Sequence, residues 1–212
     1  MAFRAGVVLR VAAMLWIIGV LALPRAQAGN NPLDDLIAPV TGKSACFRRD
    51  YDNVHLRRHA KQKTTSMVVW LKYEDTTSGQ LGLFLGIAIR QRGDSQPFFG
   101  SGGCSWGEGF NRDIQGRRLI KTYKKDTGVS CDMSAIPDVF DTLSAEEGGN
   151  LILDAGKIRD SLLVYLDESL NMVKRSDRAK PLYVKFGADD QIFQLLRADA
   201  KDCDFVERAL SR

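Results

Sequence analysis

The pattern of hydrophobic positions is clearest between residues 81 and 90. Large aliphatic side chains fill every odd position there, while Gly82, Gly86 and Ala88 lie on the even side. This alternation is typical of a β-strand with one face in a core, because successive side chains of a strand point to opposite faces. Residues 64–73 have a similar pattern, and a turn-forming cluster at 75–79 separates the two runs. The two runs therefore predict a β-hairpin.

Shorter apolar runs, bounded by turn residues, continue along the chain. They predict further strands at residues 118–123, 139–143, 151–154, 162–166, 182–186 and 192–197. About eight short strands at this spacing predict an all-β fold, either an antiparallel barrel or a sandwich.

Two segments carry helical spacing. Within residues 158–173 aliphatic side chains recur at every fourth position, which would suit a helix, but the contiguous apolar run at 162–166 favours a strand. Residues 199–210 predict a short C-terminal helix with Cys203, Val206 and Leu210 on one face.

The first 28 residues have the parts of a secretory signal. Arg4 and Arg10 give a basic start, residues 11–23 form an unbroken apolar run, and Ala-Gln-Ala ends the segment before Gly29. The apolar run is shorter than the roughly 20 residues that span a membrane. We expect cleavage after Ala28 and a periplasmic or secreted protein without a stable membrane anchor. An extended, loosely docked leader at 29–43 would precede a single β domain at 44–212.

Charge argues against one class of partner. The signal holds three of the 30 Lys and Arg residues and none of the 26 Asp and Glu residues, so the mature domain is nearly neutral. A near-neutral domain has no general attraction for nucleic acid or for an anionic membrane. We therefore expect no nucleic-acid partner.

All four cysteines lie beyond the signal, and an even number in an oxidising compartment predicts two disulfides. Three pairings are possible. We favour Cys46–Cys203, which would join the two ends of the domain, and Cys104–Cys131, which would close a loop-rich middle segment. The absence of Cys-x-x-Cys argues against a redox motif or a zinc ribbon.

Positive charge is densest just after Cys46, and both histidines lie inside this segment. An N-cap at Asp52 or Asn53 predicts a short helical turn with His55 and His59 on one face. We expect no metal, because zinc needs a third ligand and the intervening Leu-Arg-Arg would repel a divalent ion. We interpret the segment as an exposed basic surface for an anionic or protein partner. Its candidate contact residues are Arg48, Arg49, His55, Arg57, Arg58 and His59.

Residues 99–109 hold five glycines in eleven positions. A P-loop would need Gly-Lys-Ser/Thr, and a dinucleotide loop would need Gly-x-Gly-x-x-Gly between a strand and a helix. Neither pattern is present, so we expect no cofactor. The stretch instead predicts a disulfide-anchored loop whose glycines adopt positive φ angles. Trp106 on this loop is a further candidate contact residue.

Catalytic signals are weak. No Gly-x-Ser-x-Gly nucleophile elbow occurs, and the paired acids at 167–168 and 189–190 lie in predicted turns or strand ends, where solvated carboxylates are ordinary. We therefore expect a protein that is not an enzyme.

Two stretches carry a family resemblance. Residues 46–65, with Tyr51-Asp52 and His55-Leu56-Arg57-Arg58-His59-Ala60-Lys61-Gln62, resemble the opening of small exported proteins from alphaproteobacteria. Residues 186–193, Phe-Gly-Ala-Asp-Asp-Gln-Ile-Phe, followed by Cys203, resemble their close. The chain departs from the family pattern at Ala60, where that pattern has proline. The resemblance implies export and a β-rich domain, and it implies no activity.

These observations predict an exported binding or accessory domain. Two alternatives stay open. A small-ligand carrier would use Gly82, Gly86 and Ala88 to leave space inside a barrel. A secreted inhibitor of a cell-wall enzyme is possible by analogy of fold.

Overall fold

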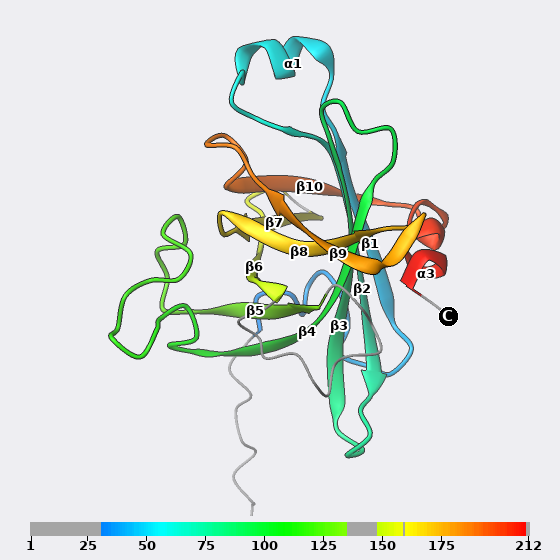
Figure 1. Ribbon diagram of the computed structural model, residues 1–212. Coiled ribbons are helices and arrows are strands. Elements are labelled where there is room, and N and C mark those ends of the chain that lie inside the picture. The colour runs from blue at the N-terminus through cyan, green and yellow to red at the C-terminus, as the bar shows by residue number, and fades with distance from the viewer. Residues whose placement is uncertain (1–30, 135–147, 159, 211–212) are drawn as a thin grey trace, which may run out of the picture.

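The strands close into a barrel. The computed structural model describes residues 31–134, 148–158 and 160–210, and within them the chain is mostly strand. Eight antiparallel strands form a closed ring, so the all-β prediction is confirmed and the barrel, rather than the sandwich, is the architecture. Figure 1 shows this arrangement, and the predicted signal at 1–28 lies outside the described residues.

The ring joins the first strand of the described chain to the last. In ring order the strands are β1 (Ser44–Asp50), β2 (Thr64–Asp75), β3 (Leu81–Gln91), β4 (Phe98–Glu108), β5 (Thr127–Ser134), β6 (Asn150–Ala155), β7 (Ser161–Leu166) and β10 (Ile192–Ala198), which pairs with β1. A hairpin of β8 (Ser169–Lys174) and β9 (Asp177–Lys185) branches from β4, where Phe98 pairs with Lys174.

The hairpin predicted from alternation is β2–β3. Its pairing runs from Asp75 opposite Leu81 up to Thr64 opposite Gln91, with an irregularity between Thr64 and Ser66. The predicted strands at 151–154, 162–166, 182–186 and 192–197 are also confirmed, as β6, β7, β9 and β10. The run at 162–166 is thus a strand and not a helix.

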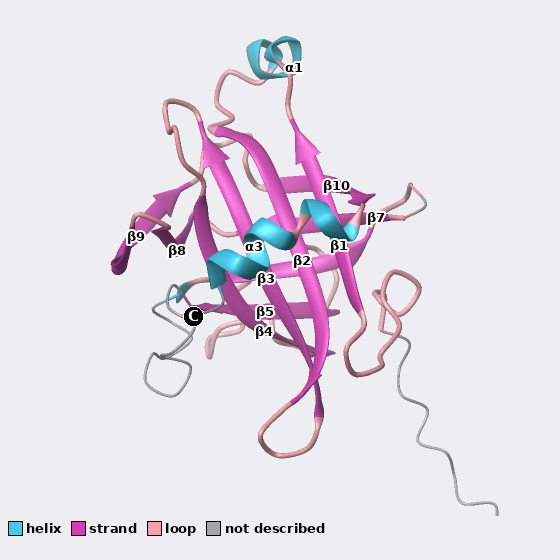
Figure 2. Ribbon diagram, turned by 90° about the vertical axis from the view of Figure 1, so that its right-hand side faces the viewer, coloured by secondary structure: helices cyan, strands magenta, loops and turns pink. Residues whose placement is uncertain are grey.

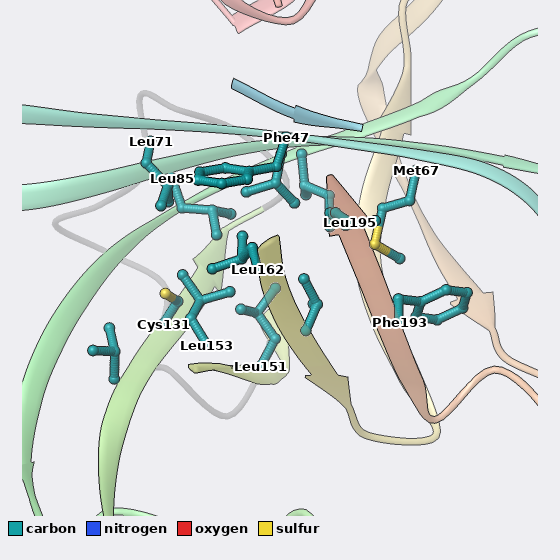
Figure 3. Packing of buried hydrophobic residues seen from close by; sticks show 14 of the residues in the cluster. Phe47, Met67, Leu71, Leu85, Cys131, Leu151, Leu153, Leu162, Phe193 and Leu195 are labelled. Carbon is teal, nitrogen blue, oxygen red and sulfur yellow. The ribbon is translucent and has the colours of Figure 1, made fainter. Parts of the chain in front are cut away.

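The barrel interior is filled with large side chains. Leu85 of β3 points inward and packs with Phe47, Leu153 and Leu195 from other strands (Figure 3), and Ile87 of β3 belongs to the same core cluster. Odd positions of β3 therefore supply the core, as their alternation indicates.

The small-residue face of β3 lies outside the barrel and does not line its interior. A Cβ at Gly86 would lie 2.7 Å from a methyl carbon of Leu210 and 3.1 Å from one of Val206, so this face is covered by a helix. Ala88 packs in the same outer cluster as Cys203 and Val206. The premise of an interior cavity lined by Gly82, Gly86 and Ala88 is therefore wrong.

The glycine-rich stretch is a strand, β4, so the loop predicted at 99–109 is wrong. Of its glycines only Gly109, after the strand, has a positive φ, 76°. Gly102 is needed for close approach, since a Cβ there would lie 2.5 Å from the backbone oxygen of Asp132 on β5. The glycines allow close packing within the sheet. Because they have no side chains, β4 lacks the alternation of large side chains by which other strands are recognised in the sequence.

Of the other strands predicted in the middle of the chain, the one at 118–123 is wrong. Residues 118–123 form no strand, apart from one isolated bridge between Arg112 and Arg118. The apolar residues Ile120 and Tyr123 of this loop instead pack on the outside of the barrel against Ile152. The strand expected at 139–143 lies outside the described residues. Strands β1, β5 and β8 were not predicted.

Both predicted helices are present. Helix α1 (Asn53–Arg58) follows β1, and a 3-10 turn η2 (Ala200–Asp202) leads into α3 (Asp204–Leu210) at the C-terminal end. Figure 2 shows α3 lying across the outer face of β1, β2 and β3. No helix in the described part of the chain has the length and apolar character needed to cross a membrane.

Both favoured disulfides form. Cys46 of β1 bonds to Cys203, just before α3, across a sequence separation of 157 residues. Cys104 and Cys131 lie opposite each other on β4 and β5, 27 residues apart in sequence. The two disulfides fit an oxidising compartment.

The leader predicted at 29–43 is not extended and not loosely docked at residues 31–37. It forms turns, and Leu33 is completely buried in the barrel core beside Leu36 and Ile37. The guanidinium group of Arg197 also donates a hydrogen bond to the Leu36 carbonyl. This segment therefore contributes to the core of the domain.

Candidate functional site

Helix α1 stands beyond one end of the barrel (Figure 1). The Asp52 carboxylate caps the helix by accepting a hydrogen bond from the His55 backbone N–H at 2.7 Å, as the sequence predicts. This hydrogen bond to the charged carboxylate is the main cause that lowers the pKa of Asp52 below its ordinary value. Leu56 is the buried residue of the helix, so α1 has little apolar anchoring of its own.

Four rings make a ladder along one side of α1. His55 and His59 are stacked with ring centres 4.3 Å apart, which confirms that they share a face. The Tyr51 ring lies 4.6 Å from His55 and 6.1 Å from Phe193 on β10. The guanidinium carbon of Arg49 lies 5.6 Å from the centre of the Tyr51 ring. The ladder therefore links α1 to the barrel wall and has a fixed cation beside it.

A hollow of about 440 Å³ opens beside the ladder. We call it the rim hollow. Its lining residues are Arg49, Tyr51, His55, His59, Gln62, Ile158, Asp189, Ile192, Phe193, Gln194 and Leu196.

Three aliphatic side chains of the rim hollow are open to solvent. Ile158 is 56% exposed, Ile192 47% and Leu196 40%. Ile192 and Leu196 share the outer face of β10, because Phe193 and Leu195 between them point into the core. The rim hollow thus combines an arginine, two histidines, the Asp189 carboxylate and exposed apolar surface.

Polar contacts from the barrel hold α1 in place. Arg92, just after β3, donates hydrogen bonds to the carbonyl oxygens of Leu56 at 2.6 Å, His59 at 3.1 Å and Gln62 at 2.8 Å. Carbonyl groups at a helix C-terminus lack partners within the helix, and a cation there is favourable. Arg92 therefore anchors the end of α1 to the barrel.

A buried carboxylate anchors the chain that follows α1. Asp190 is fully buried and accepts hydrogen bonds from the backbone N–H groups of Lys63 at 2.6 Å, Thr64 at 3.0 Å and Gly187 at 2.8 Å. Gly187 packs so closely that a Cβ there would overlap the Lys61 carbonyl oxygen. The two stretches that carry the family resemblance, 46–65 and 186–193, therefore meet at this site.

Gln62 fixes the orientation of His55. The Gln62 side-chain amide donates to the Thr64 carbonyl at 2.7 Å, so its oxygen faces His55 and lies 3.0 Å from Nε2. Because that oxygen can only accept, His55 Nε2 carries the hydrogen.

Burial raises the pKa of Tyr51 to about 12; the nearby Asp190 carboxylate raises it too, while the Arg49 charge opposes the shift. The Tyr51 phenol is therefore protonated at neutral pH. It offers the rim hollow a neutral ring and a hydroxyl group, not a base.

The predicted contact residues are divided by the fold. Arg49, His55 and His59 come together in the rim hollow. Arg48 points to the other face of β1 and pairs with Asp50 at 2.6 Å. Arg57 and Arg58 are exposed on α1 and do not line the rim hollow.

Trp106 is remote from this site. It lies on β4 opposite Val129 and is 37% exposed. It lies roughly 25 Å along β4 from Phe98. Phe98 pairs with Ile89, close to the end of β3 where Arg92 contacts α1. Trp106 and the rim hollow therefore do not form one surface.

The described residues contain no group of three His, Cys, Asp or Glu side chains placed to hold a metal ion. Nothing in the described parts of the chain positively indicates a catalytic centre.

Several residues of the rim hollow escaped sequence analysis. Tyr51 could have been noticed next to the N-cap. Ile192 and Leu196 could have been noticed as apolar residues on the polar side of a predicted strand. Asp189 carried no local signal, because its contact with Lys61 spans 128 residues of chain. Gln62 lies only seven residues from His55, so its contact depends on how the chain turns after α1.

The chain was also compared with known proteins. No protein-family model, no curated protein and no solved structure matches it. What the fold and its cross-links define is a class: a small closed antiparallel barrel of eight strands with two disulfides and a braced helix at one rim.

Proposed function

We propose that this protein is an exported, non-catalytic binding domain that holds an acidic segment of a partner protein in the rim hollow. The observation that carries the proposal is the placement of Arg49, His55 and His59 beside three solvent-exposed aliphatic side chains in one hollow. A partner segment with both carboxylates and apolar side chains complements this surface.

The support of α1 favours a preformed site. Arg92 and Asp190 hold the segment through six hydrogen bonds to backbone groups. A surface that is ordered before binding loses less conformational entropy when a partner docks. The stacking of His55 on His59 and the tilted contact of Tyr51 with His55 also cover part of these ring faces, which leaves less open aromatic surface for sugars.

Export is part of the proposal. The basic, apolar and Ala-Gln-Ala parts of residues 1–28 support secretion to the periplasm or beyond, and two disulfides fit that compartment.

Site-specific photo-crosslinking in cells that produce the protein tests the function. A photoreactive side chain replaces Leu196 in the rim hollow in one variant and Leu119, in the loop after β4, in the other. The two leucines are matched in exposure, at 40% and 37%. We expect position 196, and not position 119, to form an adduct with an acidic protein, and the adduct yield to fall as salt is raised.

A charge variant completes the experiment. Arg49→Gln in the crosslinking variant should weaken the complex about tenfold, while Lys43→Gln, at the start of the chain leading into β1, should leave it unchanged. Equal adducts at positions 119 and 196, or no adduct at position 196, would overturn the proposal.

A further inference from the structure

A second hollow lies on a different face of the molecule, between α3 and the β8–β9 hairpin. It has a volume of about 510 Å³, and its walls include Arg90, Pro97, Phe99, Arg175 and Phe205. We call it the arginine groove. Figure 2 shows the face on which α3 crosses the sheet, with β8 and β9 at its side.

Two cations of the arginine groove lack an acidic partner in the part of the chain that the structure describes. Within the described residues no carboxylate pairs with the guanidinium group of Arg90 or of Arg175. Neighbouring cations are neutralised: Arg48 pairs with Asp50 at 2.6 Å, and Lys174 pairs with Asp94 at 2.8 Å. The unpaired arginines therefore give the groove a net positive charge.

The floor between these arginines is apolar and fixed. Phe99 of β4 is almost fully buried and meets the ring of Phe205 edge to face, with ring centres 6.1 Å apart. Phe205 belongs to α3, which the Cys46–Cys203 disulfide ties to β1. The floor is therefore held in shape without a ligand.

The groove continues along the sheet. A smaller hollow of about 240 Å³ shares Arg90, Pro97 and Phe205 with it and extends over Val68 and Ala88; its other lining residues are Ser66 and the ion pair of Arg48 and Asp50. An apolar body can therefore lie along the sheet while its charged end stays near the unpaired arginines.

We propose that the arginine groove binds an amphiphilic anion, with a carboxylate or phosphate group at Arg90 and Arg175 and an apolar chain over Phe99 and Phe205. Guanidinium groups bind both oxyanions through paired hydrogen bonds. Phe205 and Pro97 offer apolar surface that an inorganic anion would leave unused. This site is separate from the rim hollow and does not depend on its function.

Four probes separate charge from apolar contact. Octanoate and octyl phosphate carry both parts, 1-octanol only the chain and inorganic phosphate only the charge. Each is titrated into the isotopically labelled mature protein and followed by amide chemical shifts in NMR. We expect saturable shifts around Phe99 and Phe205 with octanoate and octyl phosphate, and at least tenfold weaker binding of the other two. The tighter of the two amphiphiles identifies the preferred head group.

Charge variants locate the head group. Arg90→Gln and Arg175→Gln should each weaken octanoate binding about tenfold. Lys43→Gln removes an equal charge just before the first residue of β1, which does not line the groove, and should leave octanoate binding unchanged. The substitutions are at the surface, and circular dichroism checks that each variant is folded.

Three results would overturn the proposal. The first is binding of inorganic phosphate as tight as that of octanoate. The second is octanoate binding that is unaffected by both arginine substitutions. The third is no saturable binding of octanoate or octyl phosphate.

Discussion

Helices α1 and α3 have similar lengths and are held by different forces. Helix α1 buries one side chain, Leu56, and is fixed by hydrogen bonds that Arg92 donates and by one that Asp52 accepts. Helix α3 buries Val206 and Ala209 against the outer face of the sheet and is preceded by the Cys46–Cys203 bond. One helix is therefore held by directional polar contacts, and the other by apolar packing and a covalent tether.

The difference matches the sites beside them. A polar framework fixes the backbone of α1 while its outer faces remain free for ligand contact. One face of α3 is buried by apolar packing against the sheet. Phe205, at the edge of that face, lines the arginine groove. The two helices should therefore respond to different perturbations.

The largest effect is expected from removing the covalent tether. Cys46→Ser with Cys203→Ser frees a loop of 157 residues in the unfolded chain, with a loss of up to roughly 5 kcal/mol of unfolding free energy. Denaturant unfolding measures the loss, and amide exchange should show lost protection in α3 before α1.

The matched control for that variant is Cys104→Ser with Cys131→Ser. The shorter separation of 27 residues gives a ceiling of roughly 3.5 kcal/mol, with no preferential loss of protection in α3. A larger loss from this pair than from the Cys46–Cys203 pair would contradict the assignment of the main tether.

The next largest effect is expected at the polar anchor of α1. Asp190→Asn replaces an acceptor-only group, bound by three backbone N–H groups, with one that also carries donors. We expect a loss of about 3 kcal/mol of unfolding free energy, because a buried N–H is left facing a donor. Thermal unfolding measures it.

Asp189→Asn is the control for the polar anchor. Asp189 is exposed and accepts a single bond of 3.2 Å from the Lys61 N–H, so the change should cost less than about 1 kcal/mol. Equal losses at positions 189 and 190 would refute the special role of Asp190.

A smaller effect is expected from the apolar contact of α3. Val206 is fully buried against the sheet, and Val206→Ala should cost about 2 kcal/mol of unfolding free energy. Val54 of α1 is also a valine, but its side chain is 48% exposed. Val54→Ala should change stability by less than about 0.5 kcal/mol. Similar losses for both valines would remove the contrast between the helices.

The smallest effect concerns the cap of α1 and its dependence on pH. The hydrogen bond from the His55 N–H lowers the pKa of Asp52 in the folded state. Its contribution is therefore present above the ordinary pKa of aspartate and is lost as pH falls through the lowered folded value. The protection of the His55 amide from exchange, relative to its intrinsic rate at each pH, should fall over that range.

Asp52→Asn separates charge from capping. Asparagine also caps helices well, so this variant should keep α1 and lose the pH dependence. Asp52→Ala should weaken α1 at every pH. An unchanged pH response in Asp52→Asn would assign it to another group.

Sequence alone predicted those elements whose signal is local. The alternation of residues 81–90 identified β3, and the acid before 53–58 identified the cap of α1. Strand β4 was missed because Gly100 and Gly102, which let neighbouring strands pack closely, remove the large side chains that make alternation visible.

The rim hollow was predicted only in part for a related reason. His55 and His59 are four residues apart, and their shared face follows from helix geometry. The contact of Tyr51 with Phe193 depends on how β10 meets β1, and no local pattern encodes that pairing. The division of Arg48 from Arg49 follows from strand alternation and could have been predicted had β1 been recognised.

Closure of the barrel through β1 and β10 also has a consequence for how the chain is made. Synthesis proceeds from the N-terminus, so β1 emerges long before the strand that completes its pairing. Contacts between such distant segments form slowly. Cys46 meets Cys104 and Cys131 before Cys203 exists, so its earliest available partners are the wrong ones. Formation of the native disulfide therefore requires either that Cys46 stay reduced until Cys203 has been synthesised, or that a non-native disulfide of Cys46 be exchanged.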